Sequence, residues 1–484
     1  MKKIFCVALL ALSFCATVSA QHNLRTGYFL DGYIYKHKLN PAFASDRGYF
    51  AIPIAGYVSA GVESTLPAST FLNADADGKL MTFLNSKVNT DFLSDISANT
   101  NYPLNLNVDV PVISFGFHAG KSFNTLDLSL KSDVRSTVPG SLFYWAKEQY
   151  DSAMDMSNFG VNSNTRLELS YGYSRQCGEK FRFGFKLKFL AGLVKADYAM
   201  EKLALTLDND VWSVTSKGSG YYASSGMDLK TGEEGTVKGF NAPKKADAIF
   251  ESIKNTKNFG GAVDLGISWD ILSWITLSAS VTDLGVLNWK NVSTLESVEC
   301  TGYTGFEGLG ADAKDNVGSE LKSLGAGLLD VISPKVVGSE SAILDKLSAT
   351  AHAGLEILVP FYKRLSVGAL ATHRFDKVYG WQEVRGSVNW ALFRWLSFSA
   401  SHAWSFYGTD KPLQSFGGAI NFHPKGLNIF VGVDSYKPVA NVLPKFDFAD
   451  TFNTNVAVGV NFVFGKYHGR FPRKSQVQDE VLEN

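Results

Sequence analysis

The chain of 484 residues is electrically balanced, with 46 lysines and arginines against 46 aspartates and glutamates, which gives no support for a nucleic-acid partner. Glycine (44) is abundant, proline (14) is scarce and aromatic residues make up 13%, a composition that suits many β-strands. No stretch after residue 20 approaches the roughly 20 consecutive apolar residues of a transmembrane helix, so a membrane form of this chain would have to be a closed β-barrel.

The N-terminus begins as a secretory signal peptide does. Lys2 and Lys3 precede the apolar run IFCVALLALSFCATV, and the small residues VSA end at Ala20. We expect cleavage near Ala20, which sends the mature protein out of the cytoplasm. The mature chain then keeps only Cys177 and Cys300, and two such widely separated cysteines do not form a disulfide framework.

Residues 21–47 are too few for a domain, yet they carry the run LNPAFAS directly before the first expected strand. Pro41 restricts Asn40 to extended conformations and fixes its own φ, so the segment can keep a compact shape without regular pairing. We expect it to enter the lumen of a barrel as a hatch or plug, with Asn40, Pro41 and Ala42 as its motif. A flexible leader is the alternative.

From residue 48 onward, large apolar side chains recur at every second position. In FRFGFKLKF the apolar residues at 181, 183, 185, 187 and 189 alternate with Arg182, Gly184, Lys186 and Lys188, and NVAVGVNFVFG near the end alternates in the same way. This period of two predicts β-strands with two unlike faces. About 14 strands are expected (range about 12–16), near 48–62, 104–117, 124–135, 165–176, 181–195, 259–269, 274–288, 346–358, 365–376, 382–390, 395–406, 414–423, 427–435 and 452–464.

Loop lengths distinguish a membrane barrel from a soluble sandwich, whose strands would also alternate. Every connection after an even-numbered strand is short, whereas long loops follow odd-numbered strands at 63–103, 136–164, 196–258 and 289–345. This sorting is typical of outer-membrane barrels. We therefore predict an all-β fold, a transmembrane antiparallel β-barrel over 48–465 with extracellular long loops, periplasmic termini and a hydrophilic periplasmic tail at 466–484.

Two near-identical turns support this prediction. ISWDILSWITLSAS and VNWALFRWLSFSAS each hold two tryptophans five residues apart, namely Trp269 with Trp274 and Trp390 with Trp395. These four side chains would lie at one level as an aromatic girdle at the periplasmic interface. Two hairpins that share a way of packing in a soluble core are the alternative.

Three irregularities interrupt the pattern. Pro53 and Pro111 each remove a ladder donor, and the alternation slips in phase at Pro111, which predicts a bulge. The stretch 212–222 also alternates, and we place it in an extracellular hairpin with 196–208 because counting it in the wall would break the parity. Short helices are expected in the outer loops near 141–152 and 311–332.

Charged residues occupy the face of the strands that would point into the lumen. The candidates are Asp127, Lys131, Glu168, Arg182, Lys186, Lys188, Asp264, His352, Glu356, Arg385 and Asp434. Inside a barrel such charges are tolerated where water or opposite charges meet them. They can be salt-bridged packing that anchors the plug, or they can line a permeation path.

No catalytic, cofactor-binding or metal-binding constellation emerges. His402 is expected on the apolar face while Ser399 and Ser401 point inward, which separates the members of a serine–histidine site. Asp283 also falls in the apolar phase, and we expect it to cap a bulge or turn near the outer rim. Histidines are scattered and the glycine runs do not precede a helix, so neither metal nor phosphate binding is expected.

Three motifs carry a resemblance to a known family. LNPAFAS, VTDLGVLNWK (Val281–Lys290) and the terminal VAVGVNFVFG resemble a family of largely uncharacterised outer-membrane β-barrels from the Bacteroidota. That family is distantly similar to FadL-type fatty-acid channels and to PorV-type barrels of the type IX secretion system. The resemblance covers essentially the whole mature chain and implies the same strand number, a lateral opening in the wall and an N-terminal hatch with an Asn-Pro-Ala motif, which Asn40-Pro41-Ala42 matches. The chain departs from it in its long loops and tail.

Two functions follow as expectations. The first is a passive channel for small hydrophobic or amphipathic molecules, and the second is a barrel that binds partner proteins of a secretion system; a purely structural outer-membrane protein is the alternative to both. The expected partners are outer-membrane lipid and, depending on the function, small hydrophobic ligands or secretion proteins. No cofactor and no enzyme activity are expected.

Overall fold

The computed structural model describes residues 23–66, 73–74, 80–85, 87–148, 154–155, 157–208, 211–241, 246–297, 300–303, 332, 334–376, 380–407, 412–436 and 453–468. The expected signal peptide, the tail beyond residue 468 and the helix expected near 311–332, apart from Ile332, lie outside these residues. Within the described ranges, no helix is both long and apolar enough to span a membrane.

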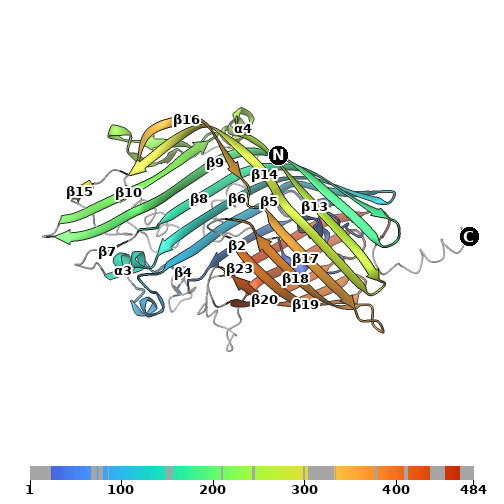
Figure 1. Cartoon of the computed structure of the whole chain (residues 1–484). Coiled ribbons are helices and arrows are strands. Elements are labelled where there is room, and N and C mark those ends of the chain that lie inside the picture. The colour runs from blue at the N-terminus through green and yellow to red at the C-terminus, as the bar shows by residue number, and fades with distance from the viewer. Residues whose placement is uncertain are drawn as a thin grey trace, which may run out of the picture.

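The wall is a closed antiparallel β-barrel with 14 strand positions, as the alternation predicts (Figure 1). In order around the barrel they are β1 (Gly48–Ala51) with β2 (Val58–Ser64), β5 (Asn101–Ala119), β6 (Ser122–Pro139), β8 (Gly160–Cys177), β9 (Phe181–Asp208), β13 (Phe259–Leu272), β14 (Ile275–Ser297), β17 (Thr350–Leu358), β18 (Leu365–Arg374), β19 (Trp381–Phe393), β20 (Leu396–Phe406), β21 (Leu413–Phe422), β22 (Leu427–Tyr436) and β23 (Asn453–Phe464). The last strand, β23, pairs with both β1 and β2, so the sheet has no free edge.

The two faces of the wall differ as the period of two requires. In β23, Val458 is 40% exposed and Phe462 is 53% exposed, whereas Asn461 is fully buried. The same contrast recurs along the other strands, with leucine, valine and phenylalanine side chains outward and polar side chains inward. The outward face therefore presents a continuous apolar surface of the kind that contacts lipid. All four tryptophans of the expected girdle, Trp269, Trp274, Trp390 and Trp395, are exposed on it next to the short turns.

The first wall position is split, where the sequence predicts one strand over 48–62. The chain leaves the ladder at 52–57, where Pro53 lacks an amide hydrogen and Ile54 has φ of +67°. The Ile54 amide instead donates to the carbonyl of Pro111 (3.3 Å) on β5. The register of β5 against β6 shifts between Pro111 and Ile113, which confirms the predicted bulge.

At the long-loop end several strands run beyond the expected boundaries. The strands expected at 181–195 and 274–288 are shorter than the observed β9 and β14, because loop segments pair with one another beyond the wall. The strand expected at 346–358 begins at Thr350 in the structure, and residues 334–346 form a separate strand. β10 (Val211–Ser224) pairs with β9 along its whole length, which confirms the predicted hairpin. β10 also pairs with β14, so beyond the end of β13 it takes the place of β13 between β9 and β14. On its other side, β14 pairs with β17 and then with β16 (Pro334–Lys346).

Further elements cap this end of the barrel. They are β3 (Asn73–Ala74), β4 (Leu80–Met81), η4 (Asp91–Asp95), α3 (Ser141–Glu148), β7 (Met154–Asp155), β11 (Asp228–Thr231), η5 (Glu233–Gly235), β12 (Val237–Asn241), α4 (Ala246–Asn255) and β15 (Cys300–Tyr303). α3 lies where the sequence predicts a helix. Phe83, Phe92, Phe143 and Leu203 form part of a buried apolar cluster, so the cap has a hydrophobic core of its own.

The face assignment is testable at the centre of β23. Val458→Arg should reduce the free energy of unfolding in lipid bilayers by about 2–4 kcal/mol, because it places a charge near the middle of the apolar surface. Gln382→Arg is the matched control: Gln382 is also exposed but lies at the long-loop end of β19, where the cost falls to about 0–1 kcal/mol. Urea titration in vesicles measures both, and equal costs would contradict the assignment.

Candidate functional site

Residues 23–47 lie inside the barrel, where Asp31 and Gly32 contact the wall near short turns and Arg25 contacts it near the long-loop ends of β19 and β22. This N-terminal segment contains two short 3-10 helices, η2 (Arg25–Gly27) and η3 (Ile34–Lys38), and almost all of its side chains are buried. It continues into β1 at the end of the wall where β23 finishes, since Gly48 is opposite Phe464. The described part of the tail, up to His468, starts at the same end, and the His468 amide donates to the carbonyl of Asp46 (2.7 Å).

The Asn-Pro-Ala motif fixes the segment to one side of the wall. The Asn40 side-chain amide donates to the carbonyls of Ile267 (3.1 Å) on β13 and Ala279 (3.3 Å) on β14. Its oxygen accepts from the amide of Ala42 (2.9 Å), whose own carbonyl accepts from Ser174. The motif thus joins a tight local turn to three wall strands.

Glycines in the wall permit this close approach. A Cβ on Gly184 of β9 would lie 2.0 Å from the carbonyl oxygen of Pro41, and one on Gly266 of β13 would lie 2.1 Å from Oδ1 of Asn40. Any side chain at either position would displace the segment, which explains two glycines at inward positions of otherwise alternating strands.

On the opposite side, four buried charged residues hold the segment: Arg25, Glu383, Arg385 and Asp434, here called the ionic latch. Nε of Arg25 lies 2.9 Å from Oε1 of Glu383, which also pairs with Nε of Arg385 at 2.9 Å. The carboxylate of Asp434 accepts from the backbone amides of Arg25 (2.6 Å) and Thr26 (2.8 Å). Because these charges are almost wholly buried, removing one of them would leave the others uncompensated.

A third group of contacts lies between these two. Lys38 donates to Asp109 (2.7 Å) on β5, and the Tyr35 hydroxyl donates to Asn461 (2.7 Å) on β23. His37 lies between the hydroxyl of Tyr49 (2.9 Å) and Nζ of Lys186 (3.2 Å). The segment therefore contacts wall strands around most of the barrel's circumference.

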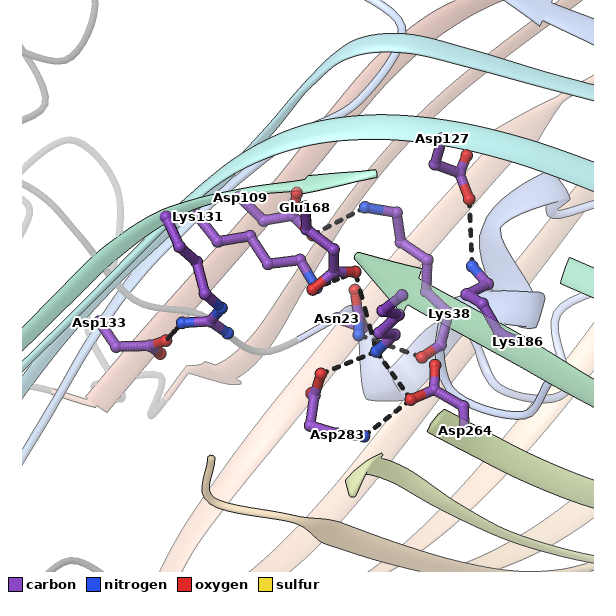
Figure 2. Close-up of polar contacts among 12 residues, drawn as sticks. Asn23, Lys38, Asp109, Asp127, Lys131, Asp133, Glu168, Lys186, Asp264 and Asp283 are labelled. Carbon is purple, nitrogen blue, oxygen red and sulfur yellow. Dashed lines mark hydrogen bonds and ion pairs between the residues drawn. The ribbon is translucent and has the colours of Figure 1, made fainter. Parts of the chain in front are cut away.

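Above the segment, Lys188 is the centre of a cluster of charges. Figure 2 labels its partners Glu168, Asp264 and Asp283. Nζ of Lys188 lies 2.7 Å from Oδ1 of both Asp264 and Asp283 and 3.7 Å from Glu168. Glu168 also pairs with Lys131 (2.9 Å). Five strands contribute to this cluster, so it links β6, β8, β9, β13 and β14 across the lumen face of the wall.

Asp283 reaches this cluster because β14 bulges. The register against β13 shifts between Val263 and Leu265, and Asp283 has φ of +61°. The expected bulge is present, and Asp283 lies one residue beyond the last pair of β14 with β17, Thr282 with Thr350. The bulge turns the side chain from the lipid-facing phase into the lumen, where Lys188 compensates its charge.

A cavity of about 580 Å³ lies between the N-terminal segment and the long-loop end. Its described lining includes ten basic and eight acidic side chains. Seven of the predicted lumen residues line it: Asp127, Lys131, Glu168, Lys186, Lys188, Asp264 and His352. Arg385 and Asp434 belong to the ionic latch instead, Glu356 is buried in β17, and Arg182 lies near the short turns, where it donates to Gln176 (3.2 Å).

Several charged residues of the lumen were missed at the level of sequence. Asp133 and Arg135 continue the inward phase of Asp127 and Lys131, and Glu383 shares the phase of Arg385, so alternation could have found all three. Arg25 and Lys38 could not be found in this way, because the N-terminal segment has no periodicity.

The expected separation of His402 from the neighbouring serines is present. The ring of His402 stacks on Phe416 at 4.7 Å on the outer face, whereas Ser399 and Ser401 are buried in the lumen. Among the described residues, no group of three or more His, Cys, Asp or Glu side chains is placed to hold a metal ion.

Taken together, the wall and its contents define a transmembrane β-barrel whose lumen is filled at one end by the chain's own N-terminal segment. The chain belongs to the family of unknown function DUF5723, whose model matches residues 41–434. No curated protein sequence matches it.

Among solved structures, the chain is similar to toluene transporters and to a FadL homologue at low identity. The toluene transporter TbuX of Ralstonia pickettii has 8% identity over 93% of this chain and 97% of its own, with a TM-score of 0.46. The P. putida toluene transporter TodX has 10% identity over 88% and 92%, with a TM-score of 0.41. A Pseudomonas aeruginosa FadL homologue has 10% identity over 93% and 100%, with a TM-score of 0.39. Function has to be inferred from this chain's own residues.

The Lys188 cluster provides a stability prediction. Lys188→Met should reduce the free energy of unfolding by about 3–5 kcal/mol, because it leaves the buried Asp264 and the partly exposed Asp283 without their shared partner. Lys121→Met, at an exposed short turn, should change it by less than about 0.5 kcal/mol. Urea unfolding of both variants in detergent micelles checks this, and an unchanged midpoint for Lys188→Met would show that the cluster is solvated.

His37 provides a pH prediction. Burial and the charge of Lys186 lower the pKa of His37 from 6.5 to about 3. Between these pH values the unfolded chain binds more protons than the folded chain, so stability is lost as the pH falls from about 6.5. At pH 5 the loss from this one residue is about 2 kcal/mol.

His37→Gln keeps an acceptor for Lys186 and a donor for Tyr49 but does not titrate. Urea unfolding at pH 7 and pH 5 should therefore show a smaller pH dependence for His37→Gln than for the unmodified chain. An identical dependence in the two proteins would mean that His37 is not buried in the lumen.

Proposed function

We propose that this protein is a passive channel of the outer membrane, closed on the periplasmic side by its own N-terminal segment. The single observation that carries the proposal is the charged cavity of about 580 Å³ that ends on this segment. A barrel with only a structural role has no need of a hydrated chamber lined by charges, whereas a solute path requires one.

The orientation follows from the two ends of the wall. Short turns, the start of β1 and the end of β23 lie at one end, and long paired loops lie at the other, which is the arrangement of outer-membrane barrels. We place the short turns and the hydrophilic tail in the periplasm and the capped end outside the cell. The exposed apolar surface between them then contacts the lipid.

The side chains that line the cavity indicate which kind of solute it accepts. Of the two classes expected from the sequence, amphipathic molecules fit better than purely hydrophobic ones, because the cavity offers many charged side chains and few apolar ones. A hydrocarbon gains nothing by displacing water from paired charges, whereas a polar group can exchange hydrogen bonds with them. In the described part of the chain, no feature favours the alternative of binding secretion proteins over the channel.

Deletion of the N-terminal segment tests the proposal. A variant that lacks residues 23–43 behind an intact signal peptide should assemble into a heat-modifiable barrel and show at least a several-fold higher single-channel conductance, since the filled half of the lumen becomes open. Deletion of 469–484 is the control of comparable size and should leave the conductance unchanged.

A milder variant covers the case in which the deletion impairs assembly. Glu383→Gln with Asp434→Asn neutralises two carboxylates that hold Arg25, one at its guanidinium group and one at its backbone amide, and should increase the frequency of open events in planar bilayers. An assembled barrel whose conductance is the same with and without the segment would reject the channel and favour a structural role.

A further inference from the structure

Two ion pairs connect strands that are not neighbours at the outer end of the cavity. Arg135 on β6 pairs with Asp376, which follows β18, and Arg374 at the end of β18 lies 3.8 Å from Asp133 on β6. Around the barrel, β8, β9, β13, β14 and β17 lie between these two strands. The pairs therefore cross the lumen, and these four residues are here called the lumen clasp.

The clasp consists of two complementary tripeptides. Asp133-Val134-Arg135 presents an acid and then a base, and Arg374-Phe375-Asp376 presents them in the opposite order. Because every second residue of a strand points to the same side, both charges of the first tripeptide face the lumen, and each meets an opposite charge of the second. Charge pairs thus form part of the outer boundary of the cavity.

A third arginine joins the clasp from β8. Nη1 of Arg166 lies 2.7 Å from Oδ2 of Asp133, the carboxylate that Arg374 also approaches. Three guanidinium groups from three strands therefore meet the carboxylates of Asp133 and Asp376. All five side chains line the cavity.

The guanidinium groups retain unused donors. Each carries five N–H donors and is always charged. The Nε atoms of Arg135, Arg166 and Arg374 are buried, and none of them has a hydrogen-bond partner among the described residues. Buried donors without partners are costly, so an acceptor toward which these side chains rotate gains charge-assisted hydrogen bonds.

We propose that the three arginines form a binding site for an oxyanion, a carboxylate or phosphate group, and that the channel therefore takes small anionic or anionic amphipathic solutes. The inference rests on the proposed function and names its substrate class. The excess of basic over acidic side chains in the lining has the sign that this class requires. Planar guanidinium forks match the two oxygens of a carboxylate or phosphate, which a lysine cannot do.

Calorimetric titration of the full chain in detergent micelles tests the site. Succinate and inorganic phosphate are the two probes, and they distinguish a carboxylate site from a phosphate site. Dimethyl succinate is the neutral control of similar shape. We expect heat of binding from at least one of the anions and none from the ester; no binding of either anion would overturn the proposal.

Variants locate the binding. Arg135→Gln and Arg374→Gln should each weaken anion binding at least tenfold, whereas Arg175→Gln, at an exposed position near a short turn, should leave it unchanged. Arg135→Lys and Arg374→Lys keep the positive charges, and so the ion pairs and the fold, but lack the planar guanidinium group. We expect each of them to weaken anion binding threefold or more. Equal affinity in all of these variants would place the anion elsewhere and reject the site.

The outcome is independent of the conductance experiment. Anion binding could depend on Arg135 and Arg374 while deletion of the N-terminal segment leaves the conductance unchanged. That result would support the anion site and contradict the channel. Higher conductance on deletion without anion binding would keep the channel and reject this substrate class.

Discussion

The lumen of a barrel of this size is too wide for wall side chains alone to fill, and the rest of the structure depends on how that space is occupied. Alternation points half of the residues of each strand inward, and here many of them are charged. Burying a charge is tolerable only when it is paired and hydrogen-bonded. The N-terminal segment supplies those partners at one end, and water-accessible charge pairs serve the same purpose above it.

The buried charges are compensated in different ways at the two ends of the lumen. Against the segment, contacts are short, buried and largely of fixed geometry, such as the amides that donate to Asp434 and the Asn40 side chain beneath β13 and β14. Above it, side chains from opposite walls meet in a cavity, and their pairing leaves donors unused. A tight closure on one side and an exchangeable ionic boundary on the other are consistent with the proposed channel, closed by its N-terminal segment.

Much of the wall could be predicted from the sequence because alternation has a direct physical cause. Lipid outside and polar contents inside impose the period of two on every strand, so Lys186 and Lys188 could be placed in the lumen before the structure was known. The phase slip at Pro111 likewise predicted a bulge. Strand ends beyond the wall were missed because they depend on pairing between loops, as in β9 with β10.

The site could be predicted only in part, since its geometry comes from distant residues. Asp283 has the lipid-facing phase, and only the positive φ at a bulge turns it toward Lys188. Arg25 meets Asp434 across 409 positions of sequence, and no local pattern signals such a contact. Pairs that cross the lumen, such as Arg135 with Asp376, depend on the shape of the closed barrel as a whole.

The most direct test of the central claim is a cross-link between the N-terminal segment and the wall. The hydroxyl oxygens of Thr26 and Ser401 lie 2.8 Å apart, so cysteines at these positions are close enough to form a disulfide. In a background with Cys177→Ser and Cys300→Ser, the barrel in vesicles should form a Thr26→Cys–Ser401→Cys bridge on mild oxidation, while the pair Thr26→Cys with Ser59→Cys should not. Mass spectrometry that finds no bridge in the assembled barrel, or finds both pairs bridged equally, would contradict a lumen filled by this segment.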